Sequence, residues 1–209
     1  MPKTAPFDVH TDAYEAWFEK HPDLYHWEIE AVEALLPYFE NAVEIGIGTG
    51  CFAIPLGIRT GVEPSAQMAA RAMEKGLEVI PGTAEELPLT DESVDLALMV
   101  TTICFVDDPK RAFEEIHRIL KPGGSVLVGF VDRETPLGRF YLEHKEESRF
   151  YAPATFFGAQ EVKGLLEAAG FVDLREVQTL FGPDLEHMEG GVKPGHGEGA
   201  FVVIRGEKA

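Results

Sequence analysis

The sequence predicts an α/β fold with a doubly wound, mostly parallel sheet and helices on both of its faces. Apolar segments typical of strands alternate with segments of helical periodicity along most of the 209 residues. Val94–Val100 is a nearly unbroken apolar run, which is typical of a strand buried on both faces of a parallel sheet. Hydrophobic residues make up 45% and charged residues 26%, and this balance indicates a globular chain with a sizeable core.

The expected elements begin with a helical N-terminal region, residues 12–36, that is broken near Pro22. Helices are expected again at 64–75, at 108–120 and at 159–169, and the last two end at glycine. No internal repeat or linker is visible, so we expect one domain over residues 1–209. The seven expected strands lie at 42–47, 58–63, 77–82, 94–100, 125–131, 172–181 and 199–207.

Two segments depart from this alternation. Residues 132–158 are polar and aromatic, and we interpret them as a partly helical insertion after the fifth strand. Residues 182–199 are rich in glycine and proline and predict a mobile loop whose role stays open.

The charge balance limits the partners. The chain has 18 Lys and Arg against 36 Asp and Glu, a net charge of −18. Such a surface repels phosphate backbones and anionic lipid, so we expect no nucleic acid and no membrane as partners. No apolar run approaches a membrane span and the first residues lack the apolar region of a signal peptide, so the expected location is the cytoplasm. The charge either favours cationic ligands or serves solubility alone.

Cysteine and histidine give no metal signal. Cys51 and Cys104 are too few for a disulfide framework and lack zinc-ligand spacing. His187 and His196, with nearby acids, are irregularly spaced in the glycine-rich loop, so we expect a tethered flap and no metal site.

The segment VEIGIGTGCF, residues 43–52, indicates where a ligand binds. It starts in the first expected strand and ends in a glycine-rich loop, and ligands of open parallel sheets bind at the carboxyl ends of strands. A dinucleotide fingerprint would need a third glycine where Cys51 stands. Glu44, two residues before Gly46, would disfavour a pyrophosphate and would stabilise an ammonium or sulfonium group.

Four motifs, in order over residues 12–180, resemble those of the class I S-adenosylmethionine-dependent methyltransferases. VEIGIGTG resembles motif I, and GVEPS resembles the second-strand motif. GTAEELPLTDESVDLALMV resembles the adenine-contacting stretch, and RAFEEIHRILKPGGSVLVG the helix and fifth strand. YAPATFFGAQEVKGLLEAAGF also resembles the helix before strand six. The pattern is most similar to the type 11 group, which includes ubiquinone and menaquinone biosynthetic enzymes.

The resemblance implies a Rossmann-like seven-stranded sheet whose last strand is antiparallel, with S-adenosyl-L-methionine as cofactor. Glu63 would hold the ribose hydroxyls, and Ala84 would pair with adenine through its backbone. Thr83 stands where the family usually has Asp, so the adenine contacts are the weakest part of the inference. Only 17 positions separate Gly46 from Glu63, so the intervening helix is short. The full set of expected cofactor-binding residues is Glu44, Gly46, Gly48, Gly50, Glu63, Pro64, Thr83, Ala84, Glu85, Thr101 and Thr102.

The resemblance also implies that residues 1–40 form a helical lid and that residues 132–158 cover the substrate site. Thr101 and Thr102 either face the point of methyl delivery or only cap the fourth strand. The aromatic residues of both segments either bind a cationic substrate or fix the lid to the sheet. Candidates for the substrate or lid contacts are Tyr14, Trp17, Phe18, Phe140, Tyr141 and Tyr151, and weak catalytic candidates are His26, His144 and Tyr14.

The expected function is therefore methyl transfer by in-line displacement to a small-molecule acceptor, either an amine or a phenol- or quinol-like compound. Two alternatives stay open: a cofactor-binding module without catalysis, and a nicotinamide-dependent oxidoreductase. The acceptor, the general base and the oligomeric state do not follow from the sequence.

Overall fold

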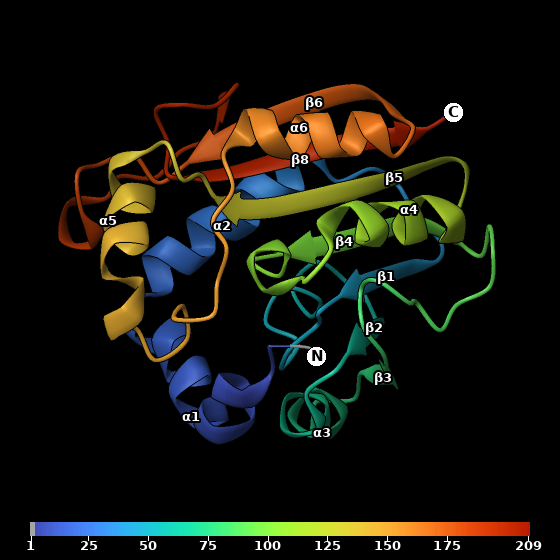
Figure 1. Ribbon diagram of the computed structural model, residues 1–209, viewed down its shortest axis with the longest axis horizontal. Coiled ribbons are helices and arrows are strands. Elements are labelled where there is room, and N and C mark those ends of the chain that lie inside the picture. The colour runs from blue at the N-terminus through green and yellow to red at the C-terminus, as the bar shows by residue number, and fades with distance from the viewer. Residues whose placement is uncertain (1–2) are drawn as a thin grey trace.

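The computed structural model describes residues 3–209 and has a twisted sheet at its centre with helices against both faces (Figure 1). The strand order is β3-β2-β1-β4-β5-β8-β6-β7. The first five of these strands are parallel, β8 is antiparallel to both β5 and β6, and β7 is antiparallel to β6. The strands are β1 Ala42–Ile45, β2 Thr60–Glu63, β3 Glu78–Pro81, β4 Val94–Val100, β5 Leu120–Val131, β6 Phe171–Thr179, β7 Lys193–Pro194 and β8 Phe201–Lys208.

The helices divide between the two faces, so the sheet is doubly wound. α4 and α6 cover one face, α2 lies against β5, β6 and β8 on the other, and α1 packs on α3 at the edge near β3 (Figure 1). The helices are α1 Ala5–Lys20, α2 Pro22–Leu35, α3 Ala66–Glu74, α4 Pro109–Ile119, α5 Pro136–His144 and α6 Ala159–Ala168, with 3₁₀ turns η1 Ile103–Phe105, η2 Lys145–Glu147 and η3 Leu185–His187.

Strand β4 shows why the apolar run predicts a central strand. Alternate side chains of a strand point to opposite faces. Leu96 and Leu98 pack among the residues of α2 and α3, while Ala97 and Met99 pack among those of α4 and α6. All four side chains are fully buried, so both faces of β4 belong to the core.

Local capping explains where the helices start. The Ser65 hydroxyl accepts the Met68 N–H at the start of α3, and the Asp108 carboxylate accepts the Arg111 N–H at the start of α4. These caps satisfy donors that the first helical turn leaves unpaired. α3 and α4 thus begin directly beside the carboxyl ends of β2 and β4, where ligands bind in this kind of sheet.

The structure corrects three expectations about the elements. The sheet has eight strands and not seven, because β7 forms inside the expected loop 182–199 and pairs with β6. The helical region starts at Ala5 and not at residue 12, although the break before Pro22 is confirmed. The short helix expected between Gly46 and Glu63 does not form, and residues 51–57 make consecutive turns instead.

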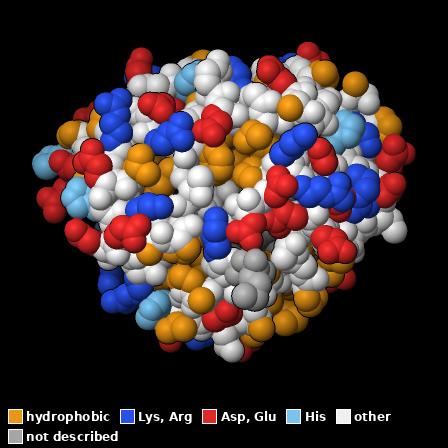
Figure 2. Space-filling view, viewed as in Figure 1, with side chains coloured by type: hydrophobic (Ala, Val, Ile, Leu, Met, Phe, Trp, Pro, Cys, Tyr) orange, Lys and Arg blue, Asp and Glu red, His pale blue; other side chains and the backbone are white. Residues whose placement is uncertain are grey.

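The surface carries mixed charges. On the face shown in Figure 2, acidic and basic side chains lie interspersed, with ion pairs such as Arg111–Glu115 and Arg118–Asp91 along α4. Between residues 3 and 209, no helix is both long enough and apolar enough to cross a membrane.

Candidate functional site

A cavity of about 240 Å³ opens at the carboxyl ends of β1, β2, β4 and β5. Its walls come from these strand ends, from α1 and α2, and from the segment around α5 (Figure 1). The expected site residues that line it are Gly46, Gly48, Glu63, Pro64, Thr83, Ala84, Glu85, Thr101 and Thr102 on the strand side, and Tyr14, Trp17, Phe18, Tyr141 and Tyr151 on the helical side.

The glycine loop forms the floor of the cavity. Gly46 has φ +73°, and a Cβ there would lie 2.4 Å from the Thr102 side chain. Gly48 has φ +57°, and a Cβ there would lie 3.6 Å from the Tyr14 hydroxyl. A positive φ strains any residue with a Cβ, so glycine is favoured at both positions for its conformation and at Gly46 also for space. Gly50 does not line the cavity, because it faces Leu77 in the core.

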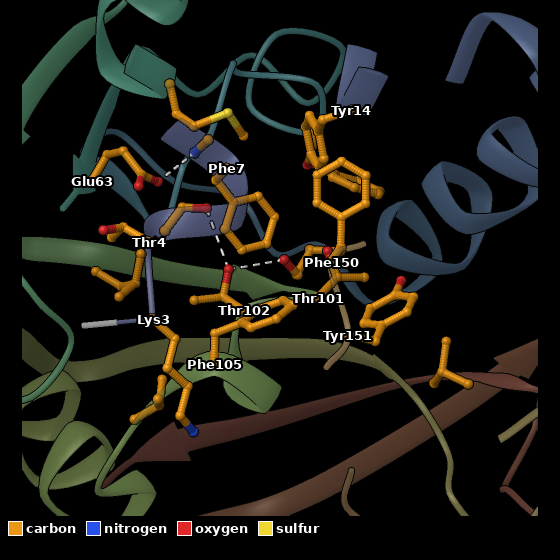
Figure 3. A pocket seen from close by; sticks show the side chains of 18 of the residues that line it. Lys3, Thr4, Phe7, Tyr14, Glu63, Thr101, Thr102, Phe105, Phe150 and Tyr151 are labelled. Atoms are coloured by element: carbon orange, nitrogen blue, oxygen red, sulfur yellow. Dashed lines mark hydrogen bonds between the residues drawn. The ribbon is translucent and has the colours of Figure 1, made fainter. Parts of the chain in front are cut away.

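The Glu63 carboxylate is fixed at the end of β2. One oxygen accepts the Gly48 N–H at 2.9 Å (Figure 3). The other accepts the Ser65 N–H at 2.8 Å. Burial raises the pKa of Glu63, and these two hydrogen bonds partly oppose that increase. Each carboxylate oxygen can accept a second hydrogen bond. Two acceptor positions therefore remain for hydroxyl groups of a ligand.

Glu44 lies behind the glycine loop and does not line the cavity. It is 2% exposed, and its Oε2 has no hydrogen-bond partner among residues 3–209. Burial raises its pKa well above the usual value, opposed by a hydrogen bond from the Ala53 backbone. The structure therefore does not place the Glu44 carboxylate in direct contact with a ligand in the cavity.

The opposite wall contains Thr83, Ala84 and Glu85. Ala84 is buried, and Glu85 Oε1 accepts the N–H groups of Asp107 and Asp108 at 2.8 and 3.2 Å. Glu85 therefore ties this wall to the segment that leads into α4.

Thr101 and Thr102 lie where β4 ends. Thr101 has φ +50°, an uncommon conformation for a residue other than glycine. The Thr102 hydroxyl donates toward the carbonyls of Gly46 and Val100, at 3.3 and 3.1 Å (Figure 3). Thr102 thus links the ends of β1 and β4, and both threonines also face the cavity.

Aromatic rings close the helical side of the cavity. Phe7 on α1 packs edge-on against Phe105 of η1 at 4.8 Å between centroids and stacks on Phe150 at 5.5 Å. The ring centroids of Tyr141 on α5 and Tyr151 lie 5.2 Å apart. Figure 3 shows Phe7, Tyr14, Phe105, Phe150 and Tyr151 around one space, with Glu63 across from them. These rings fix α1 to the later segments and wall the cavity at the same time.

Helix α1 is also held by polar contacts to α3. The Ser65 hydroxyl donates to Asp8 at 2.6 Å, and Arg71 pairs with Asp12. Lys75 pairs with Glu15 and donates to the backbone of the glycine loop. Helix α1 and the glycine loop are therefore linked through Lys75.

Comparison with known proteins agrees with this geometry. Residues 43–128 match the family model for a methyltransferase domain. A solved structure from Thermotoga maritima, an S-adenosylmethionine-dependent methyltransferase described as a possible histamine N-methyltransferase, is 53% identical and covers 98% of this chain and 99% of its own, with a TM-score of 0.94. The chain belongs to the class I S-adenosylmethionine-dependent methyltransferases. Its similarities place it in the type 11 group.

Two further relatives bear on this methyltransferase. An uncharacterized protein of Methanocaldococcus jannaschii is 40% identical over 97% of this chain and 98% of its own length. The demethylmenaquinone methyltransferase of Staphylococcus aureus is 29% identical over 65% of this chain and 69% of its own length.

The residues of the cavity fit the S-adenosylmethionine of this enzyme family. Gly48 leaves open a space that a Cβ would fill, and Glu63 keeps acceptor positions for two hydroxyls. Glu44, whose Oε2 has no hydrogen-bond partner among the described residues, lies behind the loop, where a cationic ligand would favour its ionised form. The nicotinamide alternative has no support from the three relatives.

Besides Glu44 and Gly50, three more residues expected in the methyltransferase site do not line the cavity. Phe140 is 51% exposed and stacks on His144, and neither residue lines the cavity. His26 is exposed on α2 and pairs with Glu30 at 3.3 Å. Both histidines and Phe140 point outward because their helices present other faces to the sheet. Tyr14 is the one weak catalytic candidate that lies in the cavity, and burial raises its pKa well above the usual value.

Glu28, a cavity-lining carboxyl on α2 that is only 5% exposed, was not among the residues predicted for the site. The spacing of Glu28 from apolar residues of the same helix could have predicted its burial. Glu28 is four residues after Leu24 and four before Val32, so it falls on the apolar face of α2. Leu185 of η3 was not predicted either, and it brings the expected loop 182–199 into the cavity wall.

Proposed function

We propose that this enzyme transfers the methyl group of S-adenosylmethionine to a nitrogen of a small amine. The observation that carries the proposal is the make-up of the cavity wall. Among the described residues, aromatic rings and three acidic side chains line it, and Lys3 is the one Lys or Arg. Lys3 itself lies 3.7 Å from Asp107. Aromatic faces and carboxylates both stabilise a cationic amine.

The cofactor half of the site is assigned from its hydrogen-bonding groups and its glycine loop. Glu63 would accept hydrogen bonds from the ribose hydroxyls, and the glycine loop would hold the methionine part. Thr83 and Ala84 would contact the adenine, with the backbone supplying most of the polar contacts. Thr102 would help to shape the point where the strand ends meet.

The helical elements would enclose the acceptor. Within the single domain 1–209, residues 1–40 act as a lid, of which residues 1–2 lie outside the described residues. Residues 132–158 cover the other side. Both segments are supported by their aromatic contacts, such as Phe7 with Phe150.

The chemistry asks little of the protein beyond orientation and exclusion of water. Bound S-adenosylmethionine supplies a methyl group on a positively charged sulfur. The nitrogen lone pair of the acceptor forms the new N–CH₃ bond, and the electron pair of the broken bond stays on sulfur. A closed aromatic cavity keeps water away from this exchange.

The test is a methylation assay that detects S-adenosylhomocysteine formation with a panel of small amines and a matched panel of phenols. We expect amines to exceed phenols as acceptors by tenfold or more in kcat/KM. Turnover of phenols alone, in a sample that binds S-adenosylhomocysteine, would overturn the proposal.

A second candidate is methylation of a phenol- or quinol-like acceptor. It is supported by the similarity to the Staphylococcus aureus demethylmenaquinone methyltransferase and by the largely apolar cavity wall. The phenol panel of the same assay tests it directly.

A further inference from the structure

Glu28 is a buried carboxyl group without a compensating charge. It lies in the first half of α2, lines the cavity and is 5% exposed. Charged residues are rarely so buried without a partner. No hydrogen bond or ion pair of its side chain is recorded within residues 3–209, whereas Glu63 and Glu85 each accept two backbone N–H groups.

The groups that face Glu28 are tyrosines. Tyr25 comes from its own helix, Tyr141 from α5 and Tyr151 from the segment after η2, and the charge of Glu28 acts on all three. Burial raises the pKa of each phenol, so all three are neutral near pH 7. Lys3 is not among the groups that act on Glu28. Among the described residues no cationic side chain acts on Glu28, so a cation that pairs with it would have to come from a ligand.

Glu28 and the glycine loop act on different parts of the cavity. Glu63 lies at the end of β2, whereas α2, which carries Glu28, packs against β5, β8 and β6 on the other side of β1 and β4. The Tyr151 ring lies 5.2 Å from Tyr141 of α5 and 6.2 Å from Phe105 of η1, between ring centroids. A ligand group on Glu28 is thus separate from a group at the loop.

We propose that the Glu28 carboxylate binds an ammonium group of the acceptor, and that a second, uncharged nitrogen of the same acceptor takes the methyl group. The proposal rests on the proposed N-methylation. It follows from valence: an ammonium nitrogen has no lone pair, so a nitrogen bound as a cation by a carboxylate is not the nucleophile. The acceptor class is therefore a small molecule with two basic nitrogens.

The step balances without a further reactant. The lone pair of the uncharged nitrogen forms the N–CH₃ bond, and the broken bond leaves its electron pair on the sulfur of the cofactor. The methylated nitrogen becomes positive and loses a proton to water where it carries one. The ammonium on Glu28 keeps its proton throughout, so Glu28 is an acceptor-binding residue and not the base.

The first test compares acceptors that differ in one nitrogen: 1,4-diaminobutane with 1-aminobutane, and histamine with 4-methylimidazole. Wild-type enzyme should prefer the two-nitrogen acceptor by tenfold or more in kcat/KM, mostly through KM. Glu28→Gln should bring this ratio close to one by raising KM for the two-nitrogen acceptor. Glu33→Gln, an exposed position on the same helix, should behave as wild type.

The second test needs no variant. Burial raises the pKa of Glu28 to about 8, so at pH 7 about 0.9 of the molecules carry a proton there that cation binding must release. Calorimetric titration of the wild-type S-adenosylhomocysteine complex with histamine, in phosphate and in Tris, should give a release close to that value. Glu28→Gln should release none.

The outcomes separate the two proposals. If the enzyme methylates amines but Glu28→Gln keeps the wild-type ratio of kcat/KM between the two acceptors, the role of Glu28 is overturned and N-methylation stands. The same holds if the substitution lowers kcat alone. Methylation of phenols but of no amine overturns both. S-adenosylhomocysteine binding and the far-ultraviolet circular dichroism of each variant verify that it is folded.

Discussion

Glu28 should make the stability of the enzyme depend on pH in a way that one substitution removes. Its pKa is about 8 in the folded state against 4.5 for an exposed glutamate, and the cause is burial. Between these values the folded state holds one proton more than the unfolded state. The contribution of Glu28 to stability is therefore fully present below pH 4.5 and falls as pH rises toward 8, by about 1.4 kcal/mol for each pH unit. From pH 5.5 to pH 8 the loss is about 3 kcal/mol.

Glu28→Gln keeps the shape of the side chain and removes its titration. The free energy of unfolding of the variant, relative to wild type, should therefore rise by about 3 kcal/mol between pH 5.5 and pH 8. All other groups titrate in both proteins and cancel in the difference. Urea unfolding followed by circular dichroism measures it, and the melting temperature should show a relative gain of roughly 6–12 °C.

The control is Glu33→Gln, whose side chain is exposed on the same helix. Its difference from wild type should stay constant across this pH range. A difference for Glu28→Gln that is equally flat would refute the reasoning, because the carboxyl would then be ionised in the folded enzyme at pH 5.5 as well.

Two further predictions concern the cofactor half. Glu63→Ala should weaken S-adenosylhomocysteine binding tenfold or more, roughly 1.4 kcal/mol, in calorimetric titration, whereas Glu74→Ala on the exposed side of α3 should not. An unchanged affinity would remove Glu63 from the ribose site. Gly46→Ala and Gly57→Ala introduce a Cβ at nearly the same φ, +73° and +75°, but only the first meets a neighbour, the Thr102 side chain. Both should lose about 1 kcal/mol of stability from backbone strain, and Gly46→Ala should lose more and also bind S-adenosylhomocysteine less tightly. Equal effects of the two would show that the contact with Thr102 has no energetic weight.

The cofactor half was predictable because its parts are local in sequence. A parallel strand, a glycine turn and an acid at the next strand end are each encoded within a few residues, and the sheet topology then brings them together. Glu63 and the glycine loop thus lie side by side, joined by the Gly48 hydrogen bond. Glu44 shows the limit: its position in the motif is visible, but its burial behind the loop depends on how residues 51–57 turn.

The acceptor half was less predictable because its walls come from distant segments. Glu28 lies on α2, Tyr141 on α5 and Leu185 on η3, and no short motif encodes their approach. The resemblance indicated which segments carry the aromatic residues but not their directions, and Phe140 is exposed while Tyr141 lines the cavity. The loop 182–199 was expected to be mobile because its many glycines hid the pairing of β7 with β6.

This division also has a functional consequence. The cofactor end is built from strand ends and from α1, which Lys75 ties to the glycine loop through Glu15 and the Thr49 carbonyl. The acceptor end depends on α2, α5 and η3, which pack on the other part of the sheet. Glu28 and Glu63 have no common hydrogen-bond partner among the described residues, so their substitutions should act independently. Substrate choice can then change through α2 and α5 while the cofactor site stays intact, which is consistent with one family using one cofactor for several acceptors.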